Sequence, residues 1–86
     1  MSEVKVGKVT HYFDRLGVAV FEITDGALKV GDTAHVVGHT TNFTQPIDSI
    51  QVEHQSVPSA SAGQSVGVKV KSPARQHDEV FKVVAD

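Results

Sequence analysis

The chain has 86 residues, of which 40% are hydrophobic and 21% charged, and its formal net charge at pH 7 is −2. This composition is typical of one soluble globular domain, predicted to span residues 1–86, and it excludes a disordered chain and nucleic-acid binding through overall charge. The absence of cysteine excludes disulfides and thiolate metal sites, and no apolar run approaches the roughly 20 residues that cross a membrane.

Short β-strands are predicted along nearly the whole chain, because apolar and polar residues alternate between clusters of Gly, Pro, Asp and Ser. No segment has the period of an amphipathic helix. Gly7 and Gly67 lie inside predicted strands and therefore indicate bulges or close backbone approach. Residues 54–64, HQSVPSASAGQ, are predicted to form a connection without regular structure. The predicted strands are residues 3–13, 17–23, 32–39, 46–54, 65–71 and 78–84.

The stretch GALKVGD, residues 26–32, joins two of these strands and contains two turn signals. Gly26 follows an aspartate and can adopt a positive φ. Leu28 and Val30 are predicted to point into the core, and the side chain of Asp32 is predicted to accept hydrogen bonds from nearby backbone amides. The residues expected to have turn or structural roles are Gly17, Gly26, Gly31, Asp32, Gly63 and Gly67.

About six short strands in an open sheet would leave exposed edges, and closing the sheet into a barrel removes them. We therefore predict an all-β fold, a small closed Greek-key barrel of about six strands. Phe21 and Phe81 are expected to be the larger side chains of its interior, whereas the inward face of residues 18–23 stays open. The other predicted core residues are Val9, Val18 or Ala19, Val36, Ile50, Val68 and Val83.

The order of these motifs resembles the second, β-barrel domain of translation GTPases such as elongation factor Tu and initiation factor 2. The matching parts are Val6 to Val9, Gly17 to Ile23, Gly26 to Asp32, Asp48 to Gln51, Ser61 to Val68 and Asp78 to Val80. The resemblance implies a translation-type barrel that contacts ribosomal or transfer RNA. A similar barrel occurs at the C-terminus of collagenase-like peptidases, and these motifs do not separate the two families.

Two departures limit what the resemblance implies. The chain has no G-x-x-x-x-G-K-[ST] phosphate loop, so we expect no nucleotide binding and no GTPase activity. Phe21 to Thr24 stand where elongation factors usually carry a small residue, a glycine and a basic residue. This difference puts the aminoacyl-tRNA contact of some relatives in doubt.

Catalysis and metal binding are not indicated by the polar residues. There is no nucleophile-elbow motif, and Asp78 and Glu79 are predicted to point to opposite faces of a strand. We therefore expect no enzymatic activity, no metal and no cofactor. The five histidines, which form no H-x-x-x-H or H-E-x-x-H pair, are His11, His35, His39, His54 and His77.

Two binding surfaces are predicted instead. Lys69 and Lys71 share one face of a strand, and Lys82 is expected on the next strand, which together favour contact with RNA phosphates. The alternative is a solvated face that protects a sheet edge. Phe43 is a candidate contact for a base or a protein partner, unless it packs on the barrel end. The predicted RNA-binding residues are Lys8, Arg15, Lys69, Lys71, Arg75 and Lys82, with Lys5 as an addition.

The functional prediction is a stand-alone, non-catalytic, cytoplasmic barrel that binds RNA or the ribosome as an accessory of translation. The alternative is a protein-interaction or regulatory adaptor that acts with a separate GTPase or peptidase. It predicts an exposed apolar patch near Tyr12, Phe13 or Phe43. A third class, a small enzyme or metal protein, requires histidines and carboxylates to gather in a pocket.

Overall fold

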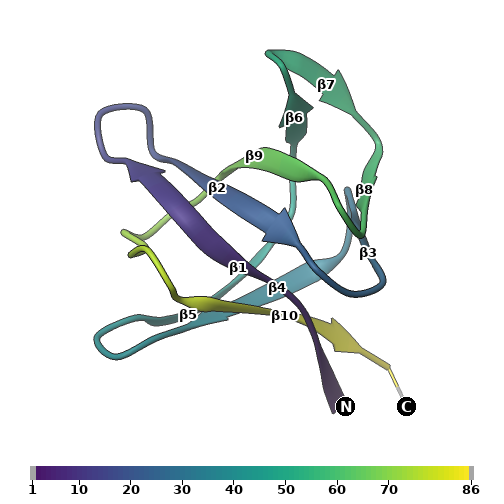
Figure 1. The fold of residues 1–86 in the computed structure, drawn as a ribbon. Coiled ribbons are helices and arrows are strands. Elements are labelled where there is room, and N and C mark those ends of the chain that lie inside the picture. The colour runs from purple at the N-terminus through teal and green to yellow at the C-terminus, as the bar shows by residue number, and fades with distance from the viewer. Residues whose placement is uncertain (1, 86) are drawn as a thin grey trace.

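The computed structural model describes residues 2–85, which form ten β-strands and no helix (Figure 1). The all-β prediction is confirmed, but the strands outnumber the predicted six. Residues 54–64 contain two strands and are not an irregular connection. The strands are β1 (Ser2–Phe13), β2 (Val18–Ile23), β3 (Ala27–Lys29), β4 (Thr33–Val37), β5 (Asn42–Pro46), β6 (Ile50–Val52), β7 (Gln55–Val57), β8 (Ser59–Ser61), β9 (Ser65–Lys69) and β10 (Glu79–Val84).

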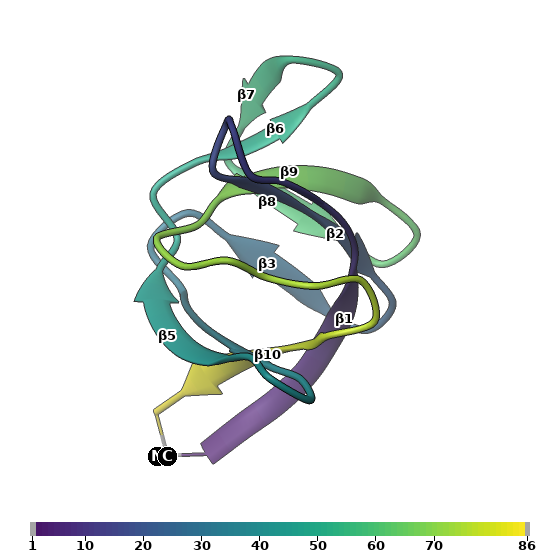
Figure 2. The same cartoon turned by 90° about the vertical axis from the view of Figure 1, so that its left-hand side faces the viewer.

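Eight strands form one antiparallel sheet in the order β5-β4-β10-β1-β2-β9-β6-β7, and β3 pairs with β8 in a second sheet. Figure 2 shows the strands curving around a common interior. The large sheet still has edges at β5 and β7, so the predicted closed barrel is not confirmed for residues 2–85. None of these residues belongs to a helix that is long and apolar enough to span a membrane.

β1 is the longest strand and pairs with β10 on one side and β2 on the other, with Ser2 opposite Val84 at its start. Its register shifts between Lys5 and Gly7 against β10, which is the irregularity predicted at this glycine. A Cβ atom on Gly7 would overlap the backbone carbonyl of Glu22. The missing side chain therefore lets two strands approach closely at the centre of the sheet.

The core contains most of the side chains that alternation predicted, including Val9, Phe21, Val36, Ile50 and Val68. Ala19 is also buried, which settles the open face of β2, because Val18 then points outward.

The prediction was wrong for Phe81 and Val83, which are only partly buried. The register of β10 against β4 places Val80 beside the buried Val36 and Phe81 beside His35, so Val80 is the residue that enters the core.

The two glycines of GALKVGD have positive φ angles, +64° at Gly26 and +99° at Gly31. Leu28 is fully buried, but Val30 is 43% exposed and does not reach the core as predicted. The reason is that β3 ends at Lys29 and a turn begins. The backbone N–H of Lys29 donates to Asp32 Oδ2 at 2.9 Å, and the N–H of Asp32 donates to the Lys29 carbonyl at 3.0 Å.

The buried side chain of Gln45 connects the edge strand β5 to the end of β9. Gln45 is 7% exposed. Its Nε2 donates to the carbonyl of Lys69 at 2.8 Å, and its Oε1 accepts the backbone N–H of Lys71 at 2.8 Å. One amide thus satisfies two backbone groups where no strand pairing is present.

We predict that Gln45→Ala lowers the free energy of unfolding by about 1–3 kcal/mol, because it leaves a backbone carbonyl and an N–H without their partner. Urea unfolding followed by circular dichroism measures the change. Gln51→Ala, at an exposed position of β6, is the control and should alter stability little. Equal stability of the two variants would contradict the bridging role of Gln45.

A second cluster of side chains connects three strands, through Glu3 of β1, His35 of β4 and Asn42 of β5. His35 Nε2 lies 2.6 Å from Asn42 Oδ1, and its Nδ1 lies 2.9 Å from Glu3 Oε2. The hydrogen bond to Asn42 raises the pKa of His35 above 6.5, and the hydrogen bond to Glu3 adds to this effect. Both ring nitrogens can donate only in the protonated imidazole.

The raised pKa predicts that His35 contributes stability below about pH 6.5 that is lost as the pH rises through its folded-state pKa. The sign follows because the folded state then binds the proton more tightly than the unfolded state. Unfolding curves of the parent and His35→Gln should therefore converge as the pH rises from about 5.5 to about 8.5. A stability difference that does not change over this range would refute the protonation linkage.

Candidate functional site

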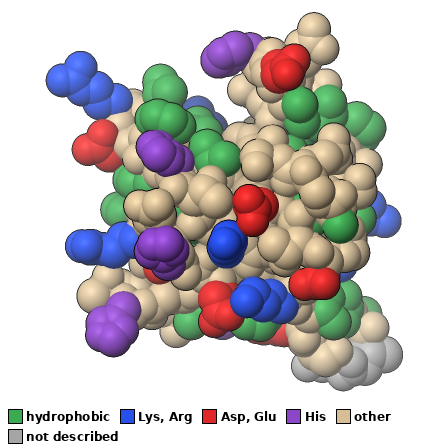
Figure 3. Space-filling model, viewed as in Figure 1, with side chains coloured by type: hydrophobic (Ala, Val, Ile, Leu, Met, Phe, Trp, Pro, Cys, Tyr) green, Lys and Arg blue, Asp and Glu red, His purple; other side chains and the backbone are tan. Residues whose placement is uncertain are grey.

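An apolar notch lies between the tip of the β1–β2 hairpin and the β6–β7 hairpin, with a volume of about 310 Å³. Figure 3 shows it as a hollow at the top of the molecule, with hydrophobic side chains on its left-hand side. The residues that line it are Phe13, Leu16, Val18, Val20, Gln51, Glu53, His54, Ser65, Val66 and Gly67.

The floor of the apolar notch exists because β2 carries apolar residues on both faces at its start, before the polar Glu22. Its buried residues point inward, while Val18 and Val20 point outward and remain partly exposed. Phe13 pairs opposite Val18, and Gly67 pairs opposite Val20. Since Gly67 has no side chain, nothing from β9 covers Val20, and the outer face of the sheet stays hollow at this point.

One wall presents two large hydrophobic side chains to water. Phe13 is 45% exposed and Leu16 is 66% exposed. The turn that carries Leu16 is held by the backbone, because the N–H groups of Leu16 and Gly17 both donate to the Phe13 carbonyl, at 3.2 and 2.9 Å. Hydrophobic residues that are exposed together beside a hollow are typical of an interaction site.

The opposite wall is the tip of the β6–β7 hairpin. Glu53 and His54 form its two-residue loop and have positive φ angles of 50° and 67°. Such a loop requires left-handed conformations at both positions and usually contains Asn or Gly. Residues in these conformations cost free energy and concentrate at functional sites.

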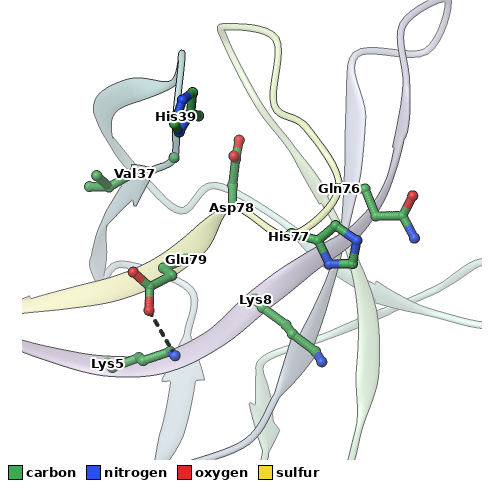
Figure 4. Close-up of a pocket in the computed structure, with 9 residues that line it drawn as sticks. Lys5, Lys8, Val37, His39, Gln76, His77, Asp78 and Glu79 are labelled. Carbon is green, nitrogen blue, oxygen red and sulfur yellow. Dashed lines mark ion pairs between the residues drawn. The ribbon is translucent and has the colours of Figure 1, made fainter.

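A second concave surface, here called the histidine groove, consists of two adjoining hollows of about 640 and 600 Å³ that share Gln76 and His77. Figure 4 shows the residues of the first hollow. The groove is lined by Lys5, Lys8, Thr10, His11, Tyr12, Val37, Gly38, His39, Ala74, Arg75, Gln76, His77, Asp78 and Glu79. In Figure 3, histidine and basic side chains gather along the left-hand side of the view.

Asp78 fixes one end of the histidine groove. It is 4% exposed, and its Oδ2 accepts the backbone N–H of Arg75 at 2.8 Å. A Cβ atom on Gly38 would overlap the Asp78 carboxylate. The β4–β5 turn must therefore have a glycine at this position for the carboxylate to fit.

Gly38→Ala is expected to destabilise the fold by about 1–3 kcal/mol, because the added methyl group displaces a buried carboxylate. Thermal unfolding measures the loss. His39→Ala, at the exposed neighbouring position, should unfold like the parent. If Gly38→Ala were as stable as His39→Ala, the close packing against Asp78 would be disproved.

The structure separates the predicted basic residues. Lys82 is not on the strand next to that of Lys69, because β1 and β2 lie between β9 and β10 in the sheet. Lys71 does not share a strand face with Lys69 as predicted, because β9 ends at Lys69. The Nζ of Lys82 donates to the Ala27 carbonyl at 3.0 Å. Lys8 lines one hollow of the histidine groove and Arg75 lines the other.

Of the other predicted residues, Arg15 and Phe43 lie apart from this groove. Arg15 is exposed in the β1–β2 turn. Phe43 is in β5 and packs against the core, as does Tyr12. Phe13 is the exposed one of the three aromatic residues that the adaptor alternative named. Leu16 was missed, and its signal was an apolar residue between the predicted strands 3–13 and 17–23. Within residues 2–85, no three histidines or carboxylates are grouped so that they could hold a metal ion.

No family model matches the chain. It is 40% identical to a collagenase of Porphyromonas gingivalis over 93% of the chain, and 32% identical to an uncharacterised protease of Methanocaldococcus jannaschii over 92%. These matches cover 20% and 19% of the two relatives. The chain therefore spans about a fifth of the length of the curated relatives it matches.

A solved structure shows the same fold. It is described as the C-terminal domain of a U32 peptidase of Geobacillus thermoleovorans and superimposes with a TM-score of 0.86 at 28% sequence identity. The similarity covers 93% of this chain and 92% of that one. A selenomethionine variant of the same domain gives a TM-score of 0.83.

These comparisons correct the functional prediction. The expected similarity to a domain of collagenase-like peptidases is confirmed, whereas the affiliation with elongation factor Tu finds no support. The prediction of an RNA-binding accessory of translation was therefore wrong. The alternative, an adaptor that acts with a peptidase, agrees better with the relatives.

Proposed function

We propose that this chain is an accessory polypeptide-binding domain that works with a U32-type peptidase and does not itself cleave peptide bonds. The observation that carries the proposal is the superposition on the C-terminal domain of a U32 peptidase over nearly the whole of both chains. The identity of 40% to a collagenase supports the same association.

The non-catalytic role is supported by the lengths of the relatives. About four fifths of each relative lies outside the segment that this chain matches. We propose that bond cleavage belongs to that larger part, the peptidase body. The accessory domain then contributes by binding, and its contact partner is a polypeptide.

The apolar notch is the proposed contact surface for the peptidase body. Protein interfaces bury an apolar centre and leave a polar rim. The notch has a related arrangement, with the apolar Val20 on its floor, Phe13 and Leu16 on one wall, and the polar Glu53 and His54 on the opposite wall. The 66% exposure of Leu16 leaves apolar area that a partner can remove from water.

A rigid scaffold is part of the same proposal. We propose that the curved sheet behaves as the small closed barrel that alternation predicts, with the Gln45 amide supplying the contact between β5 and the end of β9. Its two hydrogen bonds of 2.8 Å support this assignment. A closed scaffold would hold the two walls of the apolar notch at a fixed separation.

The test is a domain exchange in the Porphyromonas gingivalis collagenase, with this chain replacing the segment that it matches. The exchanged protein should hydrolyse gelatin, and a form without the segment should do so at least about tenfold more slowly. The isolated chain should not hydrolyse gelatin. A truncated relative as active as the whole protein, or gelatin hydrolysis by this chain alone, would overturn the proposal.

The Gly67→Val variant distinguishes an effect on the contact surface from an effect on folding. A valine side chain fills the apolar notch, and β-branched residues favour strands, so thermal stability should be kept or raised. A Cβ atom at this position would lie 3.4 Å from Val18 Cγ1, which is tolerable. In the exchanged protein, gelatin hydrolysis should fall toward that of the truncated form.

The matched control is Val30→Ser in the same exchanged protein. Val30 is 43% exposed, similar to Phe13, but it does not line the apolar notch. This variant should keep full activity. If Gly67→Val kept activity as well, the apolar notch would not be the contact surface, although the accessory role would stand.

A further inference from the structure

The turn at residues 75–78 lies at the surface, but buried flanking residues and several hydrogen bonds hold it in place. Ala74 and Asp78, which flank its exposed part, are 3% and 4% exposed. Asp78 closes the turn through Arg75, accepting its N–H at 2.8 Å and donating to its carbonyl at 3.1 Å. The turn is also joined to β1, because His77 N–H donates to the Val9 carbonyl and Val9 N–H donates to the Asp78 carbonyl, both at 2.8 Å.

This anchoring has a free-energy cost that a simple connection would not need. A buried carboxylate loses its hydration, and Asp78 accepts a backbone N–H in exchange. His77 has a φ of +78°, a conformation that side chains other than glycine rarely adopt. What the turn gains is a fixed position for the exposed side chains of Arg75, Gln76 and His77.

The charges that face the histidine groove come from three elements. β1 contributes Lys5, Lys8 and His11, the β4–β5 turn contributes His39, and the 75–79 segment contributes Arg75, His77, Asp78 and Glu79.

Both acidic side chains in this set are already engaged. Glu79 pairs with Lys5 at 2.8 Å, and Asp78 is bonded within its own turn.

The basic side chains are left largely without partners. Lys8 lies 3.8 Å from Glu22, at the far limit of an ion pair, and both are well exposed. In residues 2–85, the side chains of Arg75, His39 and His77 make no hydrogen bond or ion pair. Figure 4 shows Lys8 and His77 on the right of the view near β1, and His39 at the upper left. The groove therefore offers cationic groups and N–H donors to a ligand.

We propose that the histidine groove binds an acidic polypeptide segment in an extended conformation. Guanidinium, ammonium and imidazole N–H groups form charge-assisted hydrogen bonds with carboxylates. The two hollows share Gln76 and His77, so a strand-like segment can cross both along β1. An extended chain places alternate side chains about 7 Å apart on one face, which lets its carboxylates reach separate cations. This surface is distinct from the apolar notch and does not rest on the proposed function.

The probe is a fluorescein-labelled hexaglutamate peptide, and fluorescence anisotropy measures its binding to the whole chain. We expect saturable binding that weakens when the salt concentration rises from about 50 mM to about 300 mM. Arg75→Ala and His77→Gly should each weaken binding about threefold, and the double variant about tenfold. Lys69→Ala removes a lysine that lies outside the groove and should leave binding unchanged.

His77→Gly is the variant that separates binding from folding. Glycine adopts a positive φ without strain, so the thermal midpoint of this variant should be kept or raised while binding falls. The proposal is overturned if hexaglutamate does not bind saturably at low salt, or if Lys69→Ala weakens binding as much as Arg75→Ala. It is also overturned if an oligouridylate binds the same residues more tightly, because the surface would then recognise nucleic acid.

Discussion

The twelve-residue strand β1 is the element on which the rest of the structure depends. It is the only described strand long enough to pair with β10 along its first half and with β2 along its second half, and its two register shifts let it bend between them. Val9 of this strand also forms backbone hydrogen bonds with His77 and Asp78, in the turn that lines the histidine groove. Both concave surfaces therefore take their geometry from one strand, the groove from its middle and the apolar notch from its end at Phe13.

The apolar notch follows from a conflict between the two faces of β2. A strand with water on one side normally alternates apolar and polar residues, but on the outer face of this strand only Glu22 is polar. The β6–β7 hairpin covers part of the outer face, and Gly67 leaves the remainder open. The histidine groove has the opposite chemistry, with charged and hydrogen-bonding side chains around a buried carboxylate. The domain thus has two chemically different concave surfaces.

Sequence patterning predicted six of the strands and most of the core, because burial on one face of a strand imposes a local period of two, but it missed β3, β5, β7 and β8. It failed for Phe81 and Val83, whose face is decided by pairing with β4, a strand more than 40 residues away. It also placed Lys82 beside Lys69, since chain order does not reveal that β1 and β2 separate their strands. The anchoring of His77 by Val9 is equally non-local, so nothing near this histidine in the sequence indicates it. The motif GALKVGD identified two turns of the fold. Such turns do not distinguish a translation factor from a peptidase-associated domain.

The pairing of Ser2 with Val84 brings the two ends of the described chain to the same end of the sheet (Figure 1). The hairpin tips that form the apolar notch lie at the other end of the molecule in this view. Any polypeptide joined at either end would therefore depart from one pole. The apolar notch would then lie at the pole away from such a junction, where a neighbouring polypeptide could reach it without the junction in the way.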